Sequence, residues 1–486
     1  DMVRTACRNY ADRTALIDEQ GSYTYEEFGR AYNRVGQACL NAGFNHQSRV
    51  SMLSPNCNRA AIAMQGAMSA GMIWCNLNLR SSLEDNIDVL SRGQCDVLFY
   101  HSMVSEQVAA IKAKVPSLKL AVCIDVEDPH GVFLDTWTEG CSDKPPEVRF
   151  ADEDIAFQGA TGGTTGKPKL VLNNNHWFKN VALGFASVLL YQKPAVNLVV
   201  APISHAAGVI LGSHLAMGAV NVLMGNPDLE RILTNIETHR VTTLFLPPTV
   251  IYMLLAHPSV RDFDYSSLKY LLATSAPLSS EKIREAINVF GPVVCQAWGQ
   301  TEAGLPLTFI SPQQIHEAVL DEKKASRLMS CGQQTMITED LQIMDERGQI
   351  LTVGEKGEIV VRAPQTMVEY MDDVEATQEA QAFGWHHTGD IGYRDEDGFF
   401  YICDRKRDMV VSGGFNIYPK EIEVVVDDIE GVVESAVVGL PHADFGEAVV
   451  AVVVLQTGVD LGEADVLNLM GAQLARFKLP KRVVFV

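Results

Sequence analysis

The segment from Gly159 to Val171, GATGGTTGKPKLV, combines glycines, threonines and lysines in a way that predicts an anion-binding loop. Glycines let backbone N–H groups approach an anion, threonine hydroxyls add donors, and Lys167 and Lys169 supply positive charge. The segment is not a P-loop, which requires G-x-x-x-x-G-K followed by Ser or Thr. Here Pro168 follows Lys167, and Thr161 stands where the first glycine belongs. A different phosphate-binding solution is therefore expected.

Further polar loops follow segments with the composition of buried strands. VTTLFLP precedes PPT, LKYLLAT precedes TSAPL, and VVCQAW runs into WGQTEAG. Each strand-like run is followed by a helical pattern, such as TVIYMLLAH or SEKIREAINVF, which is typical of β-α-β units in a mostly parallel sheet. Because function in such sheets gathers at the carboxyl ends of strands, these loops are candidates for one site.

The same alternation predicts an α/β protein with several parts. RVSMLS, CDVLFY and LKLAVCID, separated by helical patterns, predict a first mostly parallel sheet, and the segments described above predict a second. After Leu341, short strands with tight turns (LQIMDERGQILTV, KGEIVVRAP) predict a small antiparallel, barrel-like subdomain. A charge cluster at 404–407 then precedes a compact α+β tail. We expect an N-terminal domain over 1–404 and a hinged C-terminal domain over 405–486.

Composition excludes several classes of function. The chain has 39 basic and 60 acidic residues, a net charge of -21, which argues against general binding to nucleic acid or to an anionic membrane. Its 10 cysteines are scattered without metal-ligand spacing, which favours reduced thiols and a cytoplasmic location. The segment 194–226 lacks charged residues, but its Pro, Asn, His and Gly residues favour a buried strand, loop and helix over a membrane span.

The motifs, taken in order along nearly the whole chain, resemble those of the adenylate-forming superfamily, in its acyl- and aryl-CoA synthetase branch. TGGTTGKPK resembles its phosphate loop, TSAPL its adenine-side loop, WGQTE its aromatic-G-x-T-E motif and HTGD its ribose-binding turn. DRKRDMVVSGGFNIYPKEIE resembles its hinge and thiol-tunnel segment. The resemblance implies a ligase that activates a carboxylate with ATP, releases pyrophosphate and transfers the acyl group from the adenylate to the thiol of CoA.

The resemblance assigns roles to individual residues around ATP. Glu302 would hold Mg²⁺, a cation that prefers oxygen ligands, and Thr301 would contact the α-phosphate. Trp298 would stack on the adenine, where the family more often has Tyr. The full set expected at the phosphates, adenine and ribose is Thr161, Gly163, Thr164, Thr165, Gly166, Lys167, Lys169, Ser275, Ala276, Pro277, Trp298, Gly299, Thr301, Asp390, Ile402 and Arg405.

His205 in PISHAAG occupies the position where the family often has a residue that lines and gates the acyl pocket. Amino-acid-activating members typically carry an Asp directly after it to pair with an ammonium group, and here that residue is Ala206. A buried ammonium without a counter-charge is costly, so an uncharged hydrophobic acid is expected. The expected acid-binding residues are His205, Ala206, Ala207, Gly208, Thr274, Ala297, Leu305 and Pro306, and the expected catalytic residues are Thr161, Lys169, His205, Thr301 and Glu302.

The resemblance also implies a mobile C-terminal domain that rotates between the two half-reactions. Arg407 occupies the hinge position, which is commonly Asp or Lys, and Gly413 and Gly414 would line the tunnel for the pantetheine arm. Two positions in the phosphate loop depart from the family pattern, Gly162 for Ser and Leu170 for Gly. The family's final P-R-T-x-x-G-K motif, whose lysine bridges carboxylate and α-phosphate, is expected beyond Val486, where the sequence stops.

Several alternatives stay open at this level. An acyl-carrier-protein ligase would make the same adenylate, a catalytically inactive homologue would bind the ligands alone, and a luciferase-like oxygenase would consume O₂. The residues do not separate aryl, medium-chain and alicyclic acids. Oligomeric state is open as well, with a homodimer among the options.

Overall fold

The computed structural model describes residues 2–161, 168–189, 194–274, 278–412, 415–442, 445–456, 458–471 and 473–486. The chain forms two compact units, one made of Asp1–Asp340 with Arg362–Gln381 and the other of Leu341–Val361 with Ala382–Val486. The expected domain boundary between residues 404 and 405 lies inside the second unit and stays a prediction.

One sheet of the first unit is mostly parallel at its centre. Its strands β10, β11, β12, β13 and β14 pair in parallel, and antiparallel pairs flank them at both ends. In spatial order the strands are β2 (Gly21–Thr24), β1 (Thr14–Asp18), β11 (Val220–Leu223), β10 (Val196–Val199), β12 (Thr243–Leu246), β13 (Tyr270–Ala273), β14 (Val294–Gln300), β15 (Gly304–Ile310) and β16 (Gly332–Gln334).

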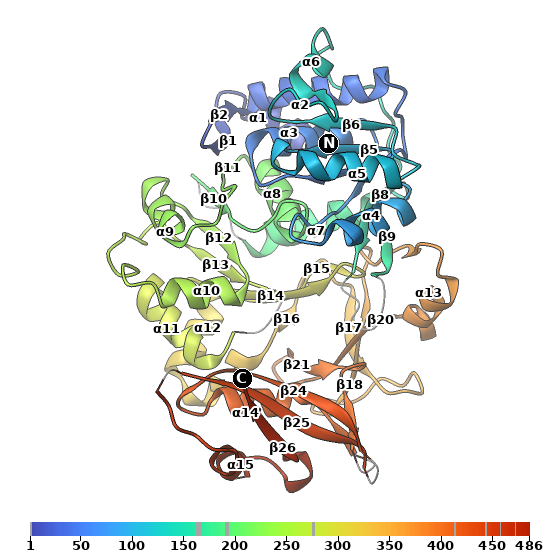
Figure 1. Ribbon diagram of the computed structural model, residues 1–486. Coiled ribbons are helices and arrows are strands. Elements are labelled where there is room, and N and C mark those ends of the chain that lie inside the picture. The colour runs from blue at the N-terminus through green and yellow to red at the C-terminus, as the bar shows by residue number, and fades with distance from the viewer. Residues whose placement is uncertain are drawn as a thin grey trace. The chain divides into compact units, whose positions relative to one another are not determined.

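Helices connect these parallel strands, as the sequence predicts. Figure 1 shows α9, α10 and α11 beside the strands that they join. The helices of this part are α1 (Met2–Asn9), α2 (Tyr25–Asn41), α8 (Ala206–Ala216), α9 (Leu229–Thr238), α10 (Pro248–Leu255), α11 (Ser280–Phe290) and α12 (Pro312–Leu320). Thr24 begins α2 through a capping box, with its side chain accepting from the Glu27 N–H and the Glu27 carboxylate accepting from the Thr24 N–H.

A second sheet of the first unit contains the glycine-rich segment. In spatial order its strands are β19 (Glu369–Tyr370), β9 (Leu170–Asn174), β8 (Ile155–Ala160), β4 (Ile73–Cys75), β3 (Arg49–Leu53), β5 (Val97–Tyr100), β6 (Leu120–Cys123) and β7 (Val132–Phe133). Pairing is parallel from β8 to β7 and antiparallel at β8–β9–β19. The associated helices are α3 (Asn58–Ser69), α4 (Leu83–Arg92), α5 (Ser105–Lys114), α6 (Leu134–Thr138), α7 (Asn175–Val188) and α13 (Val374–Ala380).

One hydrophobic core joins helices and strands of both sheets. Phe28 of α2, Ala63 of α3 and Leu211 of α8 are fully buried in it, together with strand residues such as Val50 and Leu272. Burial of apolar surface on this scale is the main source of stability for the unit. The uncharged segment 194–226 folds as β10, α8 and β11, which confirms the buried interpretation. Among the described residues, no helix combines the length and apolar character that crossing a membrane requires.

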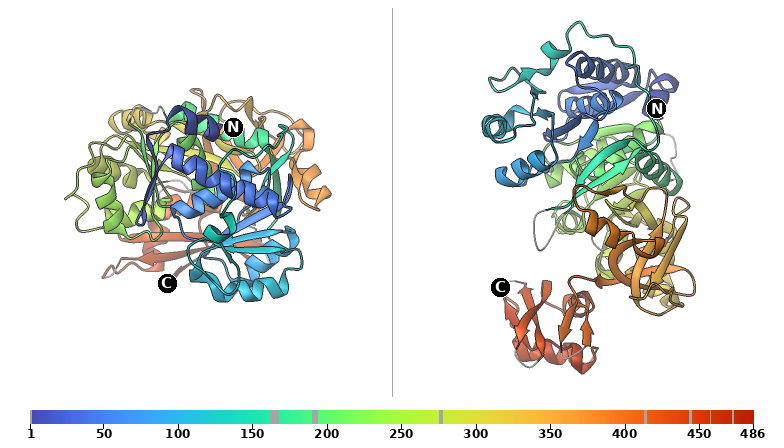
Figure 2. Two further views of the ribbon diagram at one scale, coloured as in Figure 1. Left: turned by 90° about the horizontal axis from the view of Figure 1, so that it is seen from above. Right: turned by 90° about the vertical axis from the view of Figure 1, so that its right-hand side faces the viewer.

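The second unit is mostly antiparallel. It contains β17 (Asp340–Met344), β18 (Gly357–Arg362), β20 (His386–Arg394) and β21 (Phe399–Arg405), with antiparallel pairs β18–β20 and β20–β21. Its C-terminal part, red in Figure 2, holds β22 (Val410–Ser412), β23 (Phe415–Ile417), β24 (Val432–His442), β25 (Gly446–Leu455), β26 (Arg482–Phe485), α14 (Pro419–Asp427) and α15 (Glu463–Gly471). Ile422 of α14 and Ala451 of β25 are fully buried in its own core.

Candidate active site

The glycine-rich segment connects two antiparallel strands. Ala160, the last residue of β8, pairs with Leu170, the first of β9, and the Thr161 N–H donates to the Lys169 carbonyl over 2.9 Å. Thr161 and Lys169 therefore stand at the two ends of a closed hairpin, with a hydroxyl on one side and an ammonium on the other. The predicted phosphate ligands Gly163, Thr164, Thr165, Gly166 and Lys167 lie outside the described residues.

The connection from β14 to β15 carries Thr301 and Glu302 and lies against this hairpin. The Asn173 side chain on β9 donates through Nδ2 to the Thr301 carbonyl over 3.0 Å. A Cβ atom on Gly159 of β8 would approach Thr301 Cγ2 to 2.5 Å, so only glycine permits this contact. Strands β8 and β9, which flank the predicted phosphate loop, thus both contact Thr301, the residue before the predicted metal ligand.

Trp298 and Gly299 lie in β14 and begin the predicted WGQTE motif. Trp298 is half-buried and lies opposite Thr308 of β15. A Cβ on Gly299 would stand 2.3 Å from the Gly304 carbonyl oxygen, so the close approach of β14 and β15 at this point requires glycine. Beside them, Thr274 is buried directly after β13. Ser275, Ala276 and Pro277, predicted to form the other side of the adenine slot, lie outside the described residues.

Tyr370 of β19 connects the metal-ligand candidate to the hairpin, and the sequence analysis did not select it. Its hydroxyl donates to Glu302 Oε1 over 3.2 Å, while the Lys169 ammonium lies 4.7 Å from the centre of its ring. Lys169 Nζ also lies 3.7 Å from Asp373 Oδ2. An aromatic residue after the predicted strand segment KGEIVVRAP gave no signal for this role, because the contacts join segments far apart in sequence.

The residues present fit a magnesium ion shared with phosphate. Among the described residues, no group of three or more His, Cys, Asp or Glu side chains could hold a metal by itself. Mg²⁺ is usually held by one or two carboxylates together with the phosphate oxygens of a nucleotide. A carboxylate at Glu302, next to the ends of an expected phosphate loop, has this character.

His205 precedes the first turn of α8. Its Nδ1 lies 2.8 Å from the Ser204 hydroxyl oxygen, and burial lowers the pKa of its imidazole, so the ring is neutral near pH 7. The turn is tight, because a Cβ on Gly208 would stand 1.9 Å from the Ile203 carbonyl oxygen. A neutral, partly buried histidine at the start of an uncharged helix suits a site that binds the apolar part of a carboxylic acid.

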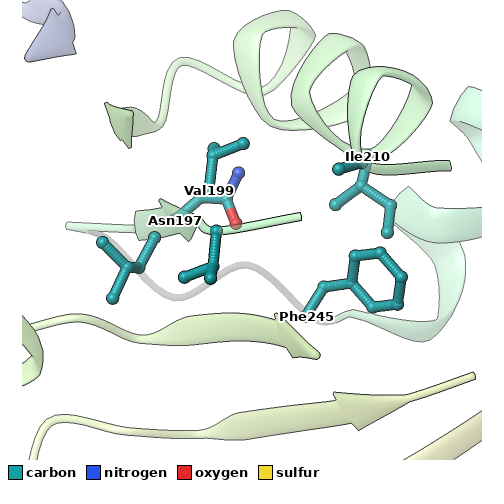
Figure 3. A pocket seen from close by; sticks show the side chains of 7 residues that line it. Asn197, Val199, Ile210 and Phe245 are labelled. Carbon is teal, nitrogen blue, oxygen red and sulfur yellow. The ribbon is translucent and has the colours of Figure 1, made fainter. Parts of the chain in front are cut away.

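A small pocket opens between β10, α8 and β12, and Ala207 of the predicted acid-binding set lines it. The other lining residues are Asn197, Leu198, Val199, Val200, Ile210 and Phe245. Figure 3 shows the Phe245 ring on the Ile210 side of the pocket. The wall is apolar apart from Asn197, whose Nδ2 is occupied by a 3.0 Å bond to Asn221 Oδ1.

The other predicted acid-binding residues occupy separate positions of the same unit. Ala206 and Gly208 lie in the first turn of α8, whereas Ala297 is buried within β14. Leu305 and Pro306 lie on β15, and the Pro306 carbonyl accepts from the Thr335 hydroxyl over 2.7 Å. Their common role in binding an acid remains a prediction.

In the second unit, a buried carboxylate organises the predicted ribose-binding turn. Glu358 Oε1 accepts from the Gly389 N–H over 3.0 Å, and its Oε2 accepts from Lys406 Nζ and lies near His387 Nδ1, each over 3.1 Å. Burial acts to raise the pKa of Glu358, but the bonds from His387 and Lys406 outweigh it and hold that pKa below its usual value. Glu358 is therefore charged at neutral pH. It too was missed by the sequence analysis.

Asp390 and Arg405 face each other on the paired strands β20 and β21. Their side chains approach to 3.7 Å, between Arg405 Nε and Asp390 Oδ1. Ile402 lies opposite Gly392 in the same pair of strands. The exposed Arg407 follows, with its Nε 3.8 Å from Asp408 Oδ1. The predicted tunnel residues Gly413 and Gly414 lie outside the described residues.

Comparisons with known proteins identify the family of the chain. A family model described as AMP-binding enzyme matches residues 3–371, and one described as AMP-binding enzyme C-terminal domain matches residues 421–486. A CoA ligase of a methyl-dioxo-octahydroindenyl-propanoyl group from Mycobacterium tuberculosis is 32% identical, over 99% of this chain and 93% of that protein. A feruloyl-CoA synthase from an Amycolatopsis species is 31% identical, over 97% of this chain and 91% of that protein.

A solved structure shows the same fold. The ATP-bound crystal structure of MatB from Rhodopseudomonas palustris superposes with a TM-score of 0.89 at 27% identity. The match covers 100% of this chain and 95% of that one. The α/β class expected from the alternating strand and helix patterns is thereby confirmed.

Proposed function

The chain belongs to the AMP-binding enzyme family, and from that premise we propose that it activates an uncharged, hydrophobic carboxylic acid. It is an AMP-forming acid–thiol ligase that uses ATP and CoA, as its relatives are CoA ligases. The observation that supports the assignment of its site is that Tyr370 contacts both Lys169, which accepts from the Thr161 N–H, and Glu302.

The reaction consists of two balanced transfers. A carboxylate oxygen of the acid attacks the α-phosphorus of ATP, and the bond to the leaving pyrophosphate breaks. The CoA sulfur then attacks the acyl carbonyl carbon, AMP leaves, and the thiol proton is released. Neither transfer needs a nucleophile from the enzyme, so the protein acts by positioning the reactants and balancing charge.

We infer the individual roles from the family resemblance, and the contacts among the described residues support them. Lys169 and Thr161 contact the β- and γ-phosphates, and Thr301 contacts the α-phosphate. Glu302 would hold Mg²⁺, and the bound ion would neutralise charge on the phosphate oxygens. Asp390 accepts hydrogen bonds from the ribose hydroxyls, with Arg405 beside it. His205 and α8 form a wall of the acid site.

The substrate class rests on Ala206 and the apolar surroundings of α8. A substrate ammonium would have no carboxylate at the position of Ala206, so amino acids are poor candidates. The two relatives carry names with an alicyclic and an aromatic acyl group, and both kinds are uncharged and bulky outside the carboxylate. An acid of this general kind is proposed here, with CoA rather than a carrier protein as acceptor.

A panel assay tests this proposal directly. Exchange of labelled pyrophosphate into ATP is measured with aryl, medium-chain and alicyclic acids and with amino acids, and positive acids are then tested for thioester formation with CoA and with a holo carrier protein. We expect exchange with hydrophobic acids and thioester with CoA. No exchange with any acid would refute the proposal, and thioester on the carrier protein alone would reassign the acceptor.

The same assay tests Glu302. Glu302→Ala should lower exchange by about 100-fold or more, as removal of a charge-stabilising group at a reaction centre typically does. Glu346→Ala, which removes an exposed carboxylate in the second unit, is the matched control and should retain exchange.

Size-exclusion chromatography of the same samples would identify a homodimer. The 10 cysteines are all free thiols, which supports the cytoplasmic location that we also propose.

A further inference from the structure

Tyr370 is held in place by backbone contacts on two sides. In β19 it pairs with Val171 of β9, two residues after Lys169, so its position is fixed relative to the end of the hairpin. Its own N–H donates to the Thr377 hydroxyl of α13 over 3.0 Å. A side chain anchored in this way can orient its neighbours, because its backbone has little freedom to move.

The hydroxyl of Tyr370 acts as a donor to the proposed metal ligand. The Tyr370 hydroxyl oxygen lies 3.2 Å from Glu302 Oε1, and the hydroxyl is the donor because an ionised carboxylate only accepts. The Met367 N–H donates to the Glu302 backbone carbonyl over 2.6 Å. One short segment, 367–370, thus holds both the main chain and the carboxylate of Glu302.

The ring of Tyr370 serves a different partner. The Lys169 ammonium lies 4.7 Å from the ring centre, within the range of a cation–π interaction, and 3.7 Å from Asp373 Oδ2. Asp373 itself begins α13 by accepting from the Ala376 N–H over 3.0 Å. The ring and hydroxyl of one residue therefore touch the two opposite charges that the ATP site is proposed to use.

We propose that Tyr370 is a positioning residue for the proposed ATP site: its hydroxyl orients the Glu302 carboxylate toward magnesium, and its ring holds Lys169 beside the phosphates. The inference rests on the proposed metal role of Glu302. The hydroxyl and the ring of Tyr370 thus have different roles. The hydroxyl affects the part of ATP binding that depends on magnesium, and the ring affects the part that does not.

The test uses binding of a non-cleavable ATP analogue, with a methylene group between its α- and β-phosphates, measured by calorimetry. Binding is compared across a magnesium series and in excess chelator. Tyr370→Phe keeps the ring and removes the hydroxyl, so it should weaken binding about 10-fold at limiting magnesium and leave binding in chelator unchanged, consistent with loss of one bond to a charged group. Tyr370→Leu should in addition weaken binding in chelator several-fold, as expected for a lost cation–π contact.

A double-mutant cycle distinguishes the two linked proposals. If Tyr370 acts through Glu302, then Tyr370→Phe should change the magnesium dependence less than about twofold in a Glu302→Gln background, because coupled residues are non-additive. If Glu302→Gln loses the magnesium dependence of binding but Tyr370→Phe binds the analogue as the parent does, the role of Tyr370 is refuted and the metal role of Glu302 stands. Parent magnesium dependence in Glu302→Gln would overturn the metal role of Glu302 and this inference with it.

Controls exclude a general effect of losing a tyrosine hydroxyl. Tyr265→Phe removes a hydroxyl that donates to the Val260 carbonyl in the same unit and should leave the magnesium series unchanged. Thermal unfolding of each variant checks its fold. If Tyr370→Phe does not fold, Tyr370→Leu and the Glu302→Gln variant still measure the two contributions, and equal binding of Tyr370→Leu and parent in chelator would overturn the role of the ring.

Discussion

Gly208 and Gly212 lie in the same helix, α8, but differ in the space that each leaves for a side chain. A Cβ on Gly208 would stand 1.9 Å from the Ile203 carbonyl oxygen, whereas one on Gly212 would meet nothing within 4 Å. Since backbone atoms cannot yield like a flexible side chain, Gly208→Ala should destabilise the protein by about 2 kcal/mol or more. Gly212→Ala should be neutral or slightly stabilising, because alanine favours helix by up to about 1 kcal/mol.

Urea unfolding of the two variants checks this pair. Gly208→Ala should also lose acid-dependent pyrophosphate exchange, because His205 stands three residues earlier in the same turn. A Gly208→Ala variant as stable as Gly212→Ala would contradict the assignment of Gly208 to a tight turn.

His386 supplies a pH-dependent contribution to stability. It is 5% exposed, and within the described part of the chain neither of its ring nitrogens has a hydrogen-bond partner. Burial, followed by the electrostatic interaction with His387, lowers the pKa of His386 from 6.5 to about 4, while Glu358 acts in the opposite direction. Above pH 6.5 both states are neutral. Between pH 6.5 and about 4 the unfolded chain binds a proton that the folded chain does not, so stability falls as pH falls, by roughly 1 kcal/mol per unit.

His386→Leu removes this titration. Its free energy of unfolding should fall less steeply than that of the parent from pH 6.5 to about 4, and the two should run parallel at higher pH. Urea unfolding at several pH values measures both slopes. Identical slopes for variant and parent would show that His386 does not titrate differently in the folded state.

At the scale of elements, the sequence predicted local features well and contacts between distant segments poorly. The helical patterns TVIYMLLAH and SEKIREAINVF, which form α10 and α11, and the uncharged run of β10, α8 and β11 gave the correct elements, since each signal lies within one stretch of chain. The family resemblance placed Thr161, Lys169 and Glu302 together. Asn173, Tyr370 and Glu358 were missed, because a lone polar side chain reveals its partner only once the strands are paired.

The Glu358 carboxylate on β18 connects the predicted ribose-binding turn to Lys406. Glu358→Gln keeps a carbonyl oxygen for the Gly389 N–H but removes the negative charge that faces Lys406 and His387. The predicted ribose-binding turn should therefore keep its shape and lose its link to the Lys406 segment. We expect a higher KM for ATP by about 10-fold, as loss of a hydrogen bond between charged groups would give, with little change in the KM for the acid.

Steady-state kinetics of pyrophosphate exchange measure the two KM values. Glu346→Gln, on the exposed turn after β17, serves as the matched loss of one carboxylate. Equal rises in the KM for ATP and for the acid would point to a general loss of structure rather than to the ribose side of the site.

At the scale of the whole molecule, the sequence predicted the class of the fold, and the expected domain boundary between residues 404 and 405 stays a prediction. The segment Arg362–Gln381 belongs to the first unit although Leu341–Val361 before it belongs to the second. Composition cannot reveal that the chain returns to the first unit, because β19 is only Glu369–Tyr370 and carries no periodic signal. The return matters for function, since this segment supplies Tyr370 and Asp373 to the candidate site.

The two-step reaction gives the last prediction, at Arg407. If the C-terminal domain rotates about this position between half-reactions, proline there should favour one arrangement, because it fixes its own φ and restricts Lys406 before it. Arg407→Pro should keep one half-reaction and slow the other by about 100-fold, a typical cost of misplaced reactants. Arg407→Ala removes the same exposed side chain without fixing the backbone and should keep both. Pyrophosphate release and transfer from a preformed acyl-adenylate to CoA, measured separately in single turnovers, decide the matter: equal slowing of both steps by proline would mean that the domain does not turn at Arg407.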